Sequence, residues 1–312
     1  MALVSFIMPA YKAKFLADSI QSILNQSFKN FELIILNDKS PDDILTIVKS
    51  FNDSRIKYYE NDVNIGGKNL VDNWNKCLSY AKGKWGILAT DDDVYDESFL
   101  NELISLSNRY SNVKLFHSRI NVIDDKNNLL RISGPLNEYE TFEEFVFHNI
   151  IAMRMQSVGE FMFCIESLRI LGGFVQMPLA WGSDGATWCA LSKPNGIVSS
   201  YKPLFSFRES GINISTLKSN MFQKVNARIE FLNYFDKYIY PFLTHKSLVQ
   251  SYYSRIIVNE GRYAIMRATL NDVESSKSLK LLFRLLNDKE KRRFLTTNGL
   301  MRKVLKLLLR PN

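Results

Sequence analysis

The chain is poor in cysteine and lacks the segments that would carry it across or into a membrane. Its three cysteines, Cys77, Cys164 and Cys189, show no C-x-x-C spacing and lie among apolar residues, which argues against disulfide or thiolate metal sites. The longest apolar runs, such as residues 4–11 and 161–165, are far shorter than the roughly 20 residues of a spanning helix. The first residues show no secretory signal pattern, so we expect a cytoplasmic globular protein.

Two phosphate-binding fingerprints are also missing. There is no G-x-G-x-x-G after the first strand-like run and no G-x-x-x-x-G-K-[ST], which argues against a dinucleotide cofactor and a P-loop. His117, His148 and His245 share no ligand spacing, so we expect them to be structural or exposed, with His117 the best placed of the three as a ligand.

Positive charge is concentrated at the C-terminal end. Residues 275–312 hold 11 of the 40 Lys and Arg but only two of the 32 Asp and Glu, although the whole chain carries a net charge of +8. The segments 278–286 and 299–312 place apolar residues among these cations at near-helical spacing. Such helices bind anionic membrane surfaces, and the alternative is a helix that packs on the protein with a basic solvated face.

Strand-like and helix-like segments alternate through the first 125 residues. Apolar runs predict strands at 4–11, 31–38, 55–61, 85–90 and 113–123, and amphipathic spacing predicts helices at 15–26, 40–51, 66–82 and 97–110. Ser40, followed by Pro41, is the expected N-cap of the second helix. This alternation indicates an α/β fold with a mainly parallel sheet and helices on both faces.

The rest of the chain divides into a second half of the domain and a helical extension. Thr141 and Glu144 predict a capping box, and residues 160–167 and 196–210 predict strands of a second sheet-like layer. From about residue 217 the chain favours helix. We therefore predict a domain of residues 1–216, with halves 1–125 and 126–216, and a basic helical region of residues 217–312.

Polar residues follow the predicted strands at the sheet edge where ligands bind in such folds. In the run GILATDDDVY, three adjacent aspartates, Asp91 to Asp93, follow an apolar stretch. Because adjacent carboxylates repel, they predict a Mg²⁺ or Mn²⁺ ion completed by phosphate oxygens. The alternative is a solvated acidic turn at the start of the next helix. Asp38 is placed to accept bonds from a base or ribose, and Lys68, beside two glycines, to meet a phosphate.

Several ordered motifs resemble one family. The runs VSFIMPAYKAKFLADSIQSILNQSFKNFELIILNDKSPDD, ENDVNIGGKN and TDDDVY are similar to the nucleotide-binding half of family 2 glycosyltransferases with the GT-A fold. The resemblance is strong over residues 3–125. It continues more loosely through ESLRILGGF, WGSDGATW and FRESGINIS, and no part of it covers the last hundred residues.

The resemblance implies a donor site and a metal. Pro9 and Tyr11 would flank the base and ribose, Asp38 would bind the nucleoside, and Lys68 would stand where the family often has arginine. Aligned on the following Val-Tyr, the acidic motif makes Asp92 the metal ligand and Asp91 the ribose contact, with Asp93 a second candidate ligand. The implied cofactor is Mn²⁺ or Mg²⁺.

The resemblance also implies the chemistry. Asp184 would be the general base, although Ser183 stands where the family usually has an acidic neighbour; the alternative for Asp184 is an N-cap. Arg208 and Trp181 are candidate contacts to a phosphate, acceptor or sugar ring, and their alternatives are a surface cation and core packing. Attack by a deprotonated acceptor hydroxyl opposite the diphosphate would invert the anomeric carbon.

The implied function is therefore a metal-dependent, inverting glycosyltransferase. It would move a sugar from a nucleoside-diphosphate sugar to a glycan or lipid-linked acceptor in surface polysaccharide synthesis, on the inner face of the cell membrane, without nucleic-acid partners. Two alternatives stay open: a non-catalytic membrane-associated module with a degenerate transferase domain, and a sugar nucleotidyltransferase. The latter should carry a glycine-rich basic loop where this chain has PAYKAKF.

Overall fold

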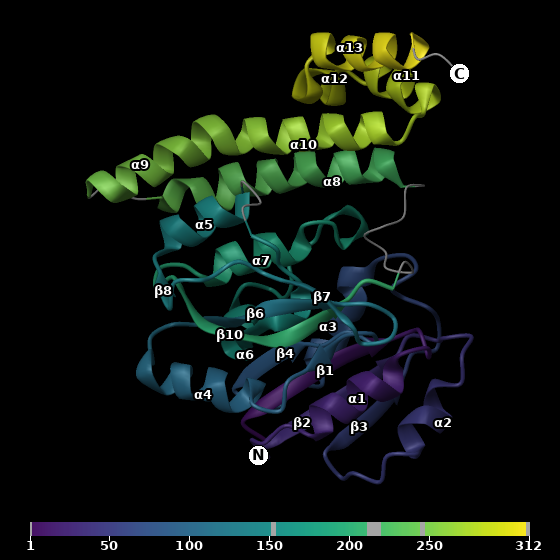
Figure 1. The fold of residues 1–312 in the computed structure, drawn as a ribbon, viewed down its shortest axis with the longest axis vertical. Coiled ribbons are helices and arrows are strands. Elements are labelled where there is room, and N and C mark those ends of the chain that lie inside the picture. Colours follow the sequence, from purple (N-terminus) through teal and green to yellow (C-terminus); the bar gives the residue numbers. More distant parts are fainter. Residues whose placement is uncertain (1, 151–153, 211–219, 244–246, 310–312) are drawn as a thin grey trace.

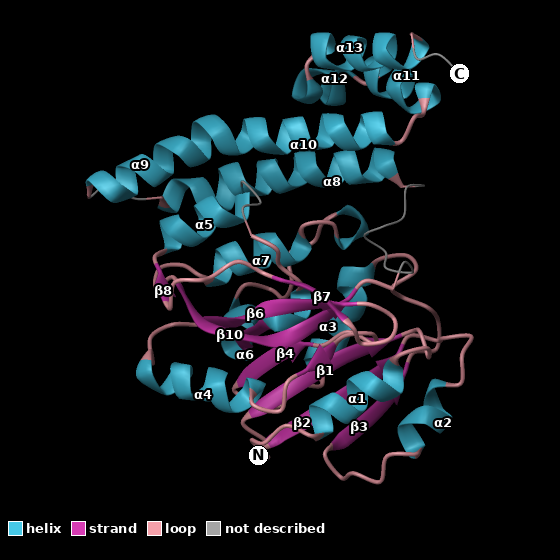
Figure 2. Ribbon diagram, viewed as in Figure 1, coloured by secondary structure: helices cyan, strands magenta, loops and turns pink. Residues whose placement is uncertain are grey.

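A computed structural model of the protein describes residues 2–150, 154–210, 220–243 and 247–309. A ten-stranded sheet lies at its centre (Figures 1 and 2). The strands are β1 (Val4–Ala10), β2 (Phe31–Asn37), β3 (Ile56–Glu60), β4 (Trp85–Leu88), β5 (Val94–Tyr95), β6 (Leu115–Ile123), β7 (Leu129–Ile132), β8 (Tyr139–Glu140), β9 (Phe161–Cys164) and β10 (Ile197–Arg208).

Helices alternate with these strands and then continue alone to the C-terminal end. They are α1 (Leu16–Leu24), α2 (Ile44–Lys49), α3 (Leu70–Ser79), α4 (Phe99–Arg109), α5 (Phe142–Ile150), α6 (Ile165–Ile170), α7 (Ser183–Leu191), α8 (Met221–Tyr234), α9 (Leu248–Ile256), α10 (Arg262–Ser275), α11 (Leu279–Asn287), α12 (Lys289–Leu295) and α13 (Thr297–Leu308). The predicted helical extension is therefore confirmed.

The sheet is mainly parallel, as predicted. Its order is β3-β2-β1-β4-β9-β6-β10-β5, with β7 on β6 and β8 on β10. The pairs β1–β2, β2–β3, β1–β4 and β6–β10 are parallel. The prediction of a second sheet-like layer was wrong. Strand β9 runs antiparallel between β4 and β6, and its pairing with both strands satisfies backbone groups that would otherwise form two buried edges.

Helices cover both faces of the sheet. One apolar core joins α1, α2 and α4 to one face, and a second core joins α3, α5, α6 and α7 to the other. Strand β2 lies between these two cores, and all seven of its residues are buried. Burial on both sides explains why its sequence, FELIILN, is nearly continuous in apolar residues rather than alternating.

The helix starts depart from prediction in two places. Helix α2 begins at Ile44, where the Asp43 carboxylate accepts a hydrogen bond from the amide of Thr46 at 3.0 Å. Ser40 is not its N-cap, because its hydroxyl donates to the carbonyl of Tyr11 at 2.5 Å and holds the loop after β1. Helix α3 begins at Leu70, so the two glycines before it lie in a loop. The capping box of Thr141 and Glu144 is confirmed at the start of α5.

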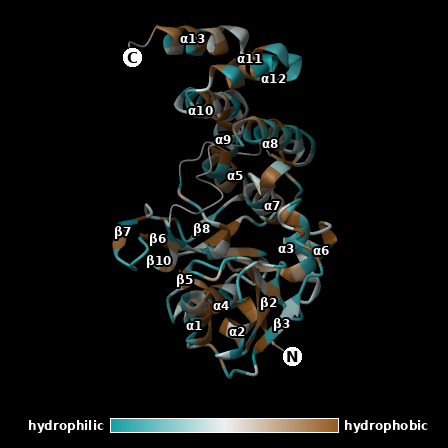
Figure 3. Ribbon diagram, turned by 90° about the vertical axis from the view of Figure 1, so that its right-hand side faces the viewer, coloured by the Kyte–Doolittle hydropathy of each residue, from teal (hydrophilic) through white to brown (hydrophobic). Residues whose placement is uncertain are grey.

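The C-terminal helices form a third apolar core. Met221, Val225 and Ile229 of α8 pack there with the helices α10 to α13, while Leu232 of the same α8 packs into the second core, between the sheet and α5 and α7. Helix α8 therefore joins the extension to the sheet domain. Figure 3 colours the C-terminal helices both brown and teal, as expected of amphipathic helices. Within the described ranges, no helix combines the length and the apolar character needed to span a bilayer.

Candidate active site

The three aspartates lie just beyond the end of β4, at the carboxyl edge of the parallel strands. Asp91 holds the loop that follows β1, because one of its carboxylate oxygens accepts hydrogen bonds from the amides of Tyr11 and Lys12, both at 2.8 Å. Burial, with the neighbouring charge of Asp92, raises the pKa of Asp91 above its ordinary value. The expectation that these strand ends meet at one edge is therefore met for the loops after β1 and β4.

Both carboxylate oxygens of Asp93 accept hydrogen bonds from the protein. The donors are the amide of Arg208 at 2.9 Å and the hydroxyl of Thr90 at 2.6 Å. The Asp93 carbonyl accepts a further bond from the Ser19 hydroxyl at 2.7 Å. Burial first, and then the charge of Asp92, raise the pKa of Asp93 to about 8. Both carboxylate oxygens of Asp93 therefore already have donors from the protein.

Asp92 is the carboxylate best placed to hold a cation. Its side chain is 8% exposed, and its carboxylate pairs with the ammonium group of Lys12 at 3.4 Å. Carboxylate oxygens are the donors that Mg²⁺ and Mn²⁺ prefer. Among the described residues, no three His, Cys, Asp or Glu side chains converge into a metal site. The Asp92 carboxylate by itself fits an ion that takes one or two protein oxygens and completes its shell with phosphate and water.

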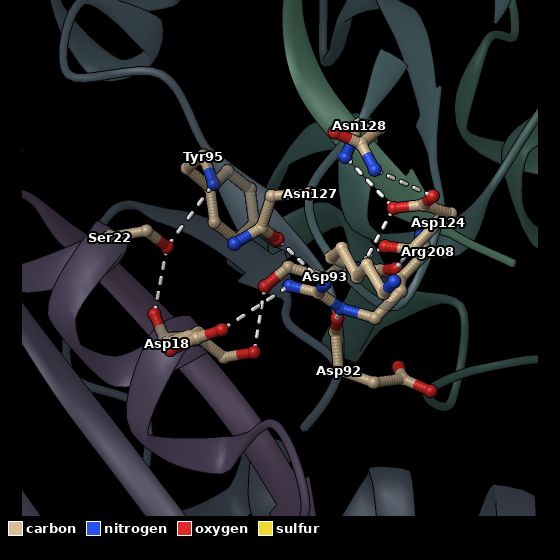
Figure 4. Close-up of polar contacts among 11 residues, drawn as sticks. Asp18, Ser22, Asp92, Asp93, Tyr95, Asp124, Asn127, Asn128 and Arg208 are labelled. Atoms are coloured by element: carbon tan, nitrogen blue, oxygen red, sulfur yellow. Dashed lines mark hydrogen bonds and ion pairs between the residues drawn. The ribbon is translucent and has the colours of Figure 1, made fainter. Parts of the chain in front are cut away.

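Arg208, at the end of β10, forms hydrogen bonds with the acidic loop (Figure 4). The residue is fully buried. Its guanidinium donates to the carbonyl of Asp92 at 2.8 Å, the carbonyl of Asp124 at 3.2 Å and the side-chain oxygen of Asn127 at 2.6 Å, and lies over the Phe15 ring. The surface-cation alternative is thus wrong for this residue, and its guanidinium faces protein oxygens rather than an open phosphate site.

Asp38 organises the loop between β3 and α3. Its carboxylate accepts hydrogen bonds from the Asn61 amide group at 2.7 Å and from the backbone amides of Ile65 at 2.8 Å and Gly66 at 2.7 Å. A Cβ atom on Gly66 would lie 2.7 Å from the same carboxylate, so glycine is required for this close approach. The loop carries Lys68, which is exposed.

Two other predicted nucleotide contacts lie at the same edge. Pro9 is partly buried near the end of β1, where it pairs with Leu36. Tyr11 follows directly and is 43% exposed. An exposed side chain in this loop is accessible to a ligand. The structure thus brings Pro9, Tyr11 and the acidic motif together through the two amide bonds to Asp91.

Asp184 lies in the first turn of α7. It is not the N-cap, since that position is Gly182, whose φ of 84° favours glycine. Burial raises the pKa of Asp184, and hydrogen bonds from its own amide and that of Gly185 oppose the rise. A carboxylate with a raised pKa is a stronger base than an exposed aspartate, which suits the predicted role.

The two tryptophans that flank Asp184 have different surroundings. Trp188 is buried and stacks on Phe161 with 4.8 Å between ring centres, so it is a core residue. The ring of Trp181 lies under the ammonium group of Lys224 at 4.3 Å. The motif FRESGINIS extends into residues 211–219, which lie outside the described residues, as does His245.

Sequence reasoning missed two residues, Lys12 and Glu160. Lys12 pairs with Asp92, and Asn61, at the end of a predicted strand, joins Asp38 to the side-chain oxygen of Asn73 at 2.9 Å. Glu160 is buried beside His117. Lys12 follows Tyr11 directly, so its place in the loop after β1 was a usable signal; the other contacts join residues far apart in sequence.

Comparison with known proteins identifies the family of the chain. The model of the family described as Glycosyl transferase family 2 matches residues 5–164. WfgD of Escherichia coli, a UDP-Glc:alpha-D-GlcNAc-diphosphoundecaprenol beta-1,3-glucosyltransferase, is 25% identical over 234 residues, which cover 75% of this chain and 86% of WfgD. Several other curated relatives match over less than half of their own length.

Two solved structures share the fold. TarS residues 1–349 of S. aureus, in complex with UDP-GlcNAc, superimposes with a TM-score of 0.57 at 16% identity, covering 98% of this chain and 90% of that one. The mannosyltransferase PcManGT of Pyrobaculum calidifontis, in complex with GDP-Man and Mn²⁺, does so with a TM-score of 0.54 at 15% identity, covering 98% and 87%. The predicted GT-A fold is confirmed.

Proposed function

Since the chain belongs to glycosyl transferase family 2 and is therefore a glycosyltransferase, we propose that it moves a sugar from a nucleoside-diphosphate sugar to an acceptor hydroxyl with inversion. The observation that carries this proposal is the acidic loop after β4. There the carboxylates of Asp91 and Asp93 accept hydrogen bonds from backbone amides and a hydroxyl group. The carboxylate of Asp92 contacts only the ammonium group of Lys12 among the contacts described above, and can bind a cation.

The donor site in this proposal is the edge formed by the loops after β1, β2, β3 and β4. Pro9 and Tyr11 flank the base and ribose, and Asp91 contacts the ribose through its second oxygen. Asp38 and Lys68 complete the nucleotide contacts. Asp92, with Asp93 as the second candidate, would hold Mn²⁺ or Mg²⁺, which when bound neutralises charge on the leaving diphosphate.

Asp184 supplies the base. Its carboxylate takes the proton of the acceptor hydroxyl as that oxygen attacks the anomeric carbon, and the bond to the diphosphate breaks on the opposite face. This geometry requires inversion and no covalent intermediate. Asp92 and Asp184 lie on separate halves of the domain, residues 1–125 and 126–216, so each half would hold one substrate.

The acceptor in this proposal is a glycan or a lipid-linked oligosaccharide of surface polysaccharide synthesis. The support is the name of WfgD, which acts on a diphosphoundecaprenol-linked sugar. Such a substrate is held at a membrane. The basic helical region, residues 217–312, would therefore place the enzyme on the inner face of the cell membrane as a peripheral protein.

One face of α13 supports that membrane contact. Most apolar residues of α11 to α13 pack inside the third core, but Met301, Leu305, Leu308 and Leu309 are exposed at helical spacing. Arg302, also exposed, lies on the same helix.

We expect Leu305→Glu to weaken sedimentation with vesicles that contain phosphatidylglycerol. Leu248→Glu, at an exposed leucine of α9, is the matched control. Equal sedimentation of both variants would contradict a membrane role for α13.

The function is tested by sugar transfer. The wild type is incubated with Mn²⁺, an undecaprenyl-diphosphate-linked N-acetylglucosamine and each of UDP-Glc, UDP-Gal, UDP-GlcNAc and GDP-Man, and nucleoside diphosphate release is measured. We expect turnover with one donor, an inverted anomeric proton signal in the NMR spectrum of the product, and a loss of about 100-fold or more in Asp184→Asn. Asp96→Asn, at an exposed helix-start carboxylate, should retain activity. A retained anomeric configuration would refute the mechanism.

A further inference from the structure

One face of the C-terminal region carries a groove formed by a single helix. Helices α9 and α10 are joined by a π-helical turn, residues 257–261, into one continuous helix of residues 248–275, called the long helix below (Figure 1). Other faces of the long helix contact α5, α8, α12 and α13. The groove has a volume of about 510 Å³, and its described lining residues all belong to the long helix, among them Ile256, Glu260, Tyr263, Ala264, Arg267 and Asn271.

Two opposite charges in this groove are available to a partner. Glu260 and Arg267 are both exposed, and neither side chain has a hydrogen bond or ion pair among the residues that the structure describes. By contrast, Arg262 of the same helix pairs with Asp236. A helix pairs opposite charges three or four positions apart. At those positions from Glu260 and Arg267 the long helix has only uncharged residues: Ile256, Ile257, Tyr263, Ala264, Leu270 and Asn271.

The order of residues along the groove complements itself when it is reversed. If two copies of the long helix pack antiparallel about the midpoint between Tyr263 and Ala264, Glu260 of each copy lies opposite Arg267 of the other. The same symmetry sets Tyr263, which is 53% exposed, opposite the small side chain of Ala264. Parallel packing would instead place like charges opposite each other. The charges therefore favour one arrangement, an antiparallel pair with two-fold symmetry.

We propose that the groove is the interface of a homodimer in which the two long helices pack antiparallel. Two symmetry-related Glu260–Arg267 ion pairs set the orientation and register, and Tyr263 and Ala264 of both copies form the apolar centre. At 1.5 Å per residue the long helix is about 42 Å long, and the midpoint between Tyr263 and Ala264 lies near its middle. Contact can therefore extend over several helical turns on both sides of the two-fold axis.

The test is sedimentation velocity of the full chain over a series of protein concentrations, which requires no substrate. We expect the mass of the wild type to rise with concentration to twice the 36.1 kDa of one chain. Glu260→Arg and Arg267→Glu should each weaken dimerisation by roughly tenfold or more, because each places two pairs of like charges at the interface.

The exchange of both charges distinguishes a lost contact from a misfolded chain. The double variant with Glu260→Arg and Arg267→Glu again has opposite charges in both pairs, so it should dimerise like the wild type. An equimolar mixture of the two single variants should also form dimers, because one copy then carries two arginines and the other two glutamates at the four positions.

Arg302→Glu is the matched control. It makes the same charge reversal at an exposed residue of α13, outside the groove, and should dimerise like the wild type. A wild type that stays at the mass of one chain at every concentration would overturn the proposal. So would single variants that dimerise as well as the wild type, or a double variant and a mixture that both fail to recover the dimer.

Discussion

Replacement of Arg208 by methionine should both destabilise the protein and weaken nucleotide binding. The buried guanidinium donates to the carbonyls of Asp92 and Asp124 and to Asn127 at 2.6–3.2 Å. Hydrogen bonds from a charged donor are worth about 1.5–3 kcal/mol each, and the acceptors would be left buried without partners. The ion pair with Asp18 adds little, because it is 3.6 Å long and Asp18 is about half exposed.

These contributions are not additive, so we expect Arg208→Met to lower the free energy of unfolding by roughly 3–5 kcal/mol, measured by urea denaturation. Because the same guanidinium holds the carbonyl of Asp92, Mn²⁺-dependent nucleotide binding should also fall at temperatures where the variant stays folded. The loss of nucleotide affinity would then arise from the displaced carbonyl of Asp92, because the Arg208 side chain itself does not contact the ligand in this account.

Arg55 offers a matched control. Its guanidinium also lies over a phenylalanine ring, Phe31, at 4.3 Å and bonds to a carboxylate and a carbonyl, but it is 23% exposed and lies at the opposite end of the strands. Arg55→Met should cost only about 1–2 kcal/mol and leave nucleotide binding unchanged. The reasoning is refuted if both variants lose the same stability, or if Arg208→Met binds nucleotide as the wild type does.

Three further outcomes follow from the site. Gly66→Ala, whose Cβ would lie 2.7 Å from the Asp38 carboxylate, should lower the melting temperature by several degrees, whereas Gly134→Ala, where a Cβ meets no atom within 4 Å, should not. The raised pKa of Asp184 should place the acidic limb of kcat/KM above the ordinary aspartate value of 3.8, and a limb at or below that value would contradict the raised pKa. The folded-state pKa of Asp93 is raised from 3.8 to about 8, so in the absence of divalent cation the free energy of unfolding should fall as the pH rises from 3.8 to 8. In Asp93→Asn this fall, measured by urea denaturation at each pH, should be smaller than in the wild type.

Most of the sheet could be predicted from sequence because its central strands, such as β1 and β2, are buried on both sides. The apolar runs at 4–11 and 31–38 have no polar alternation to confuse with a surface element, and β1 and β2 lie there. The start of α2 could not be predicted, since the choice between Ser40 and Asp43 depends on the contact of Ser40 with Tyr11. The place of β9 depends on the partners β4 and β6, which local sequence does not specify.

The acidic motif was predicted, and the family resemblance made Asp92 the metal ligand and Asp91 the ribose contact; those roles stay predictions. The structure adds the hydrogen-bond donors, which sequence did not show: two backbone amides for Asp91, an amide and a hydroxyl for Asp93, and a lysine ammonium for Asp92. Arg208 was noticed as a cation, yet only the tertiary structure shows that its guanidinium is buried. Contacts across more than a hundred residues, such as Arg208 to Asp92, leave no local signal.

The most direct test of the donor site is a thermal-shift panel of UDP, GDP, CDP and dTDP, each with and without Mn²⁺, on the wild type, Asp92→Asn and Asp96→Asn. A ligand that binds only the folded state raises the midpoint, so no acceptor is needed. We predict a Mn²⁺-dependent rise with one nucleotide that is lost in Asp92→Asn and kept in Asp96→Asn. A rise that Asp92→Asn retains, or no rise with any nucleotide, would contradict a metal–diphosphate site at Asp92.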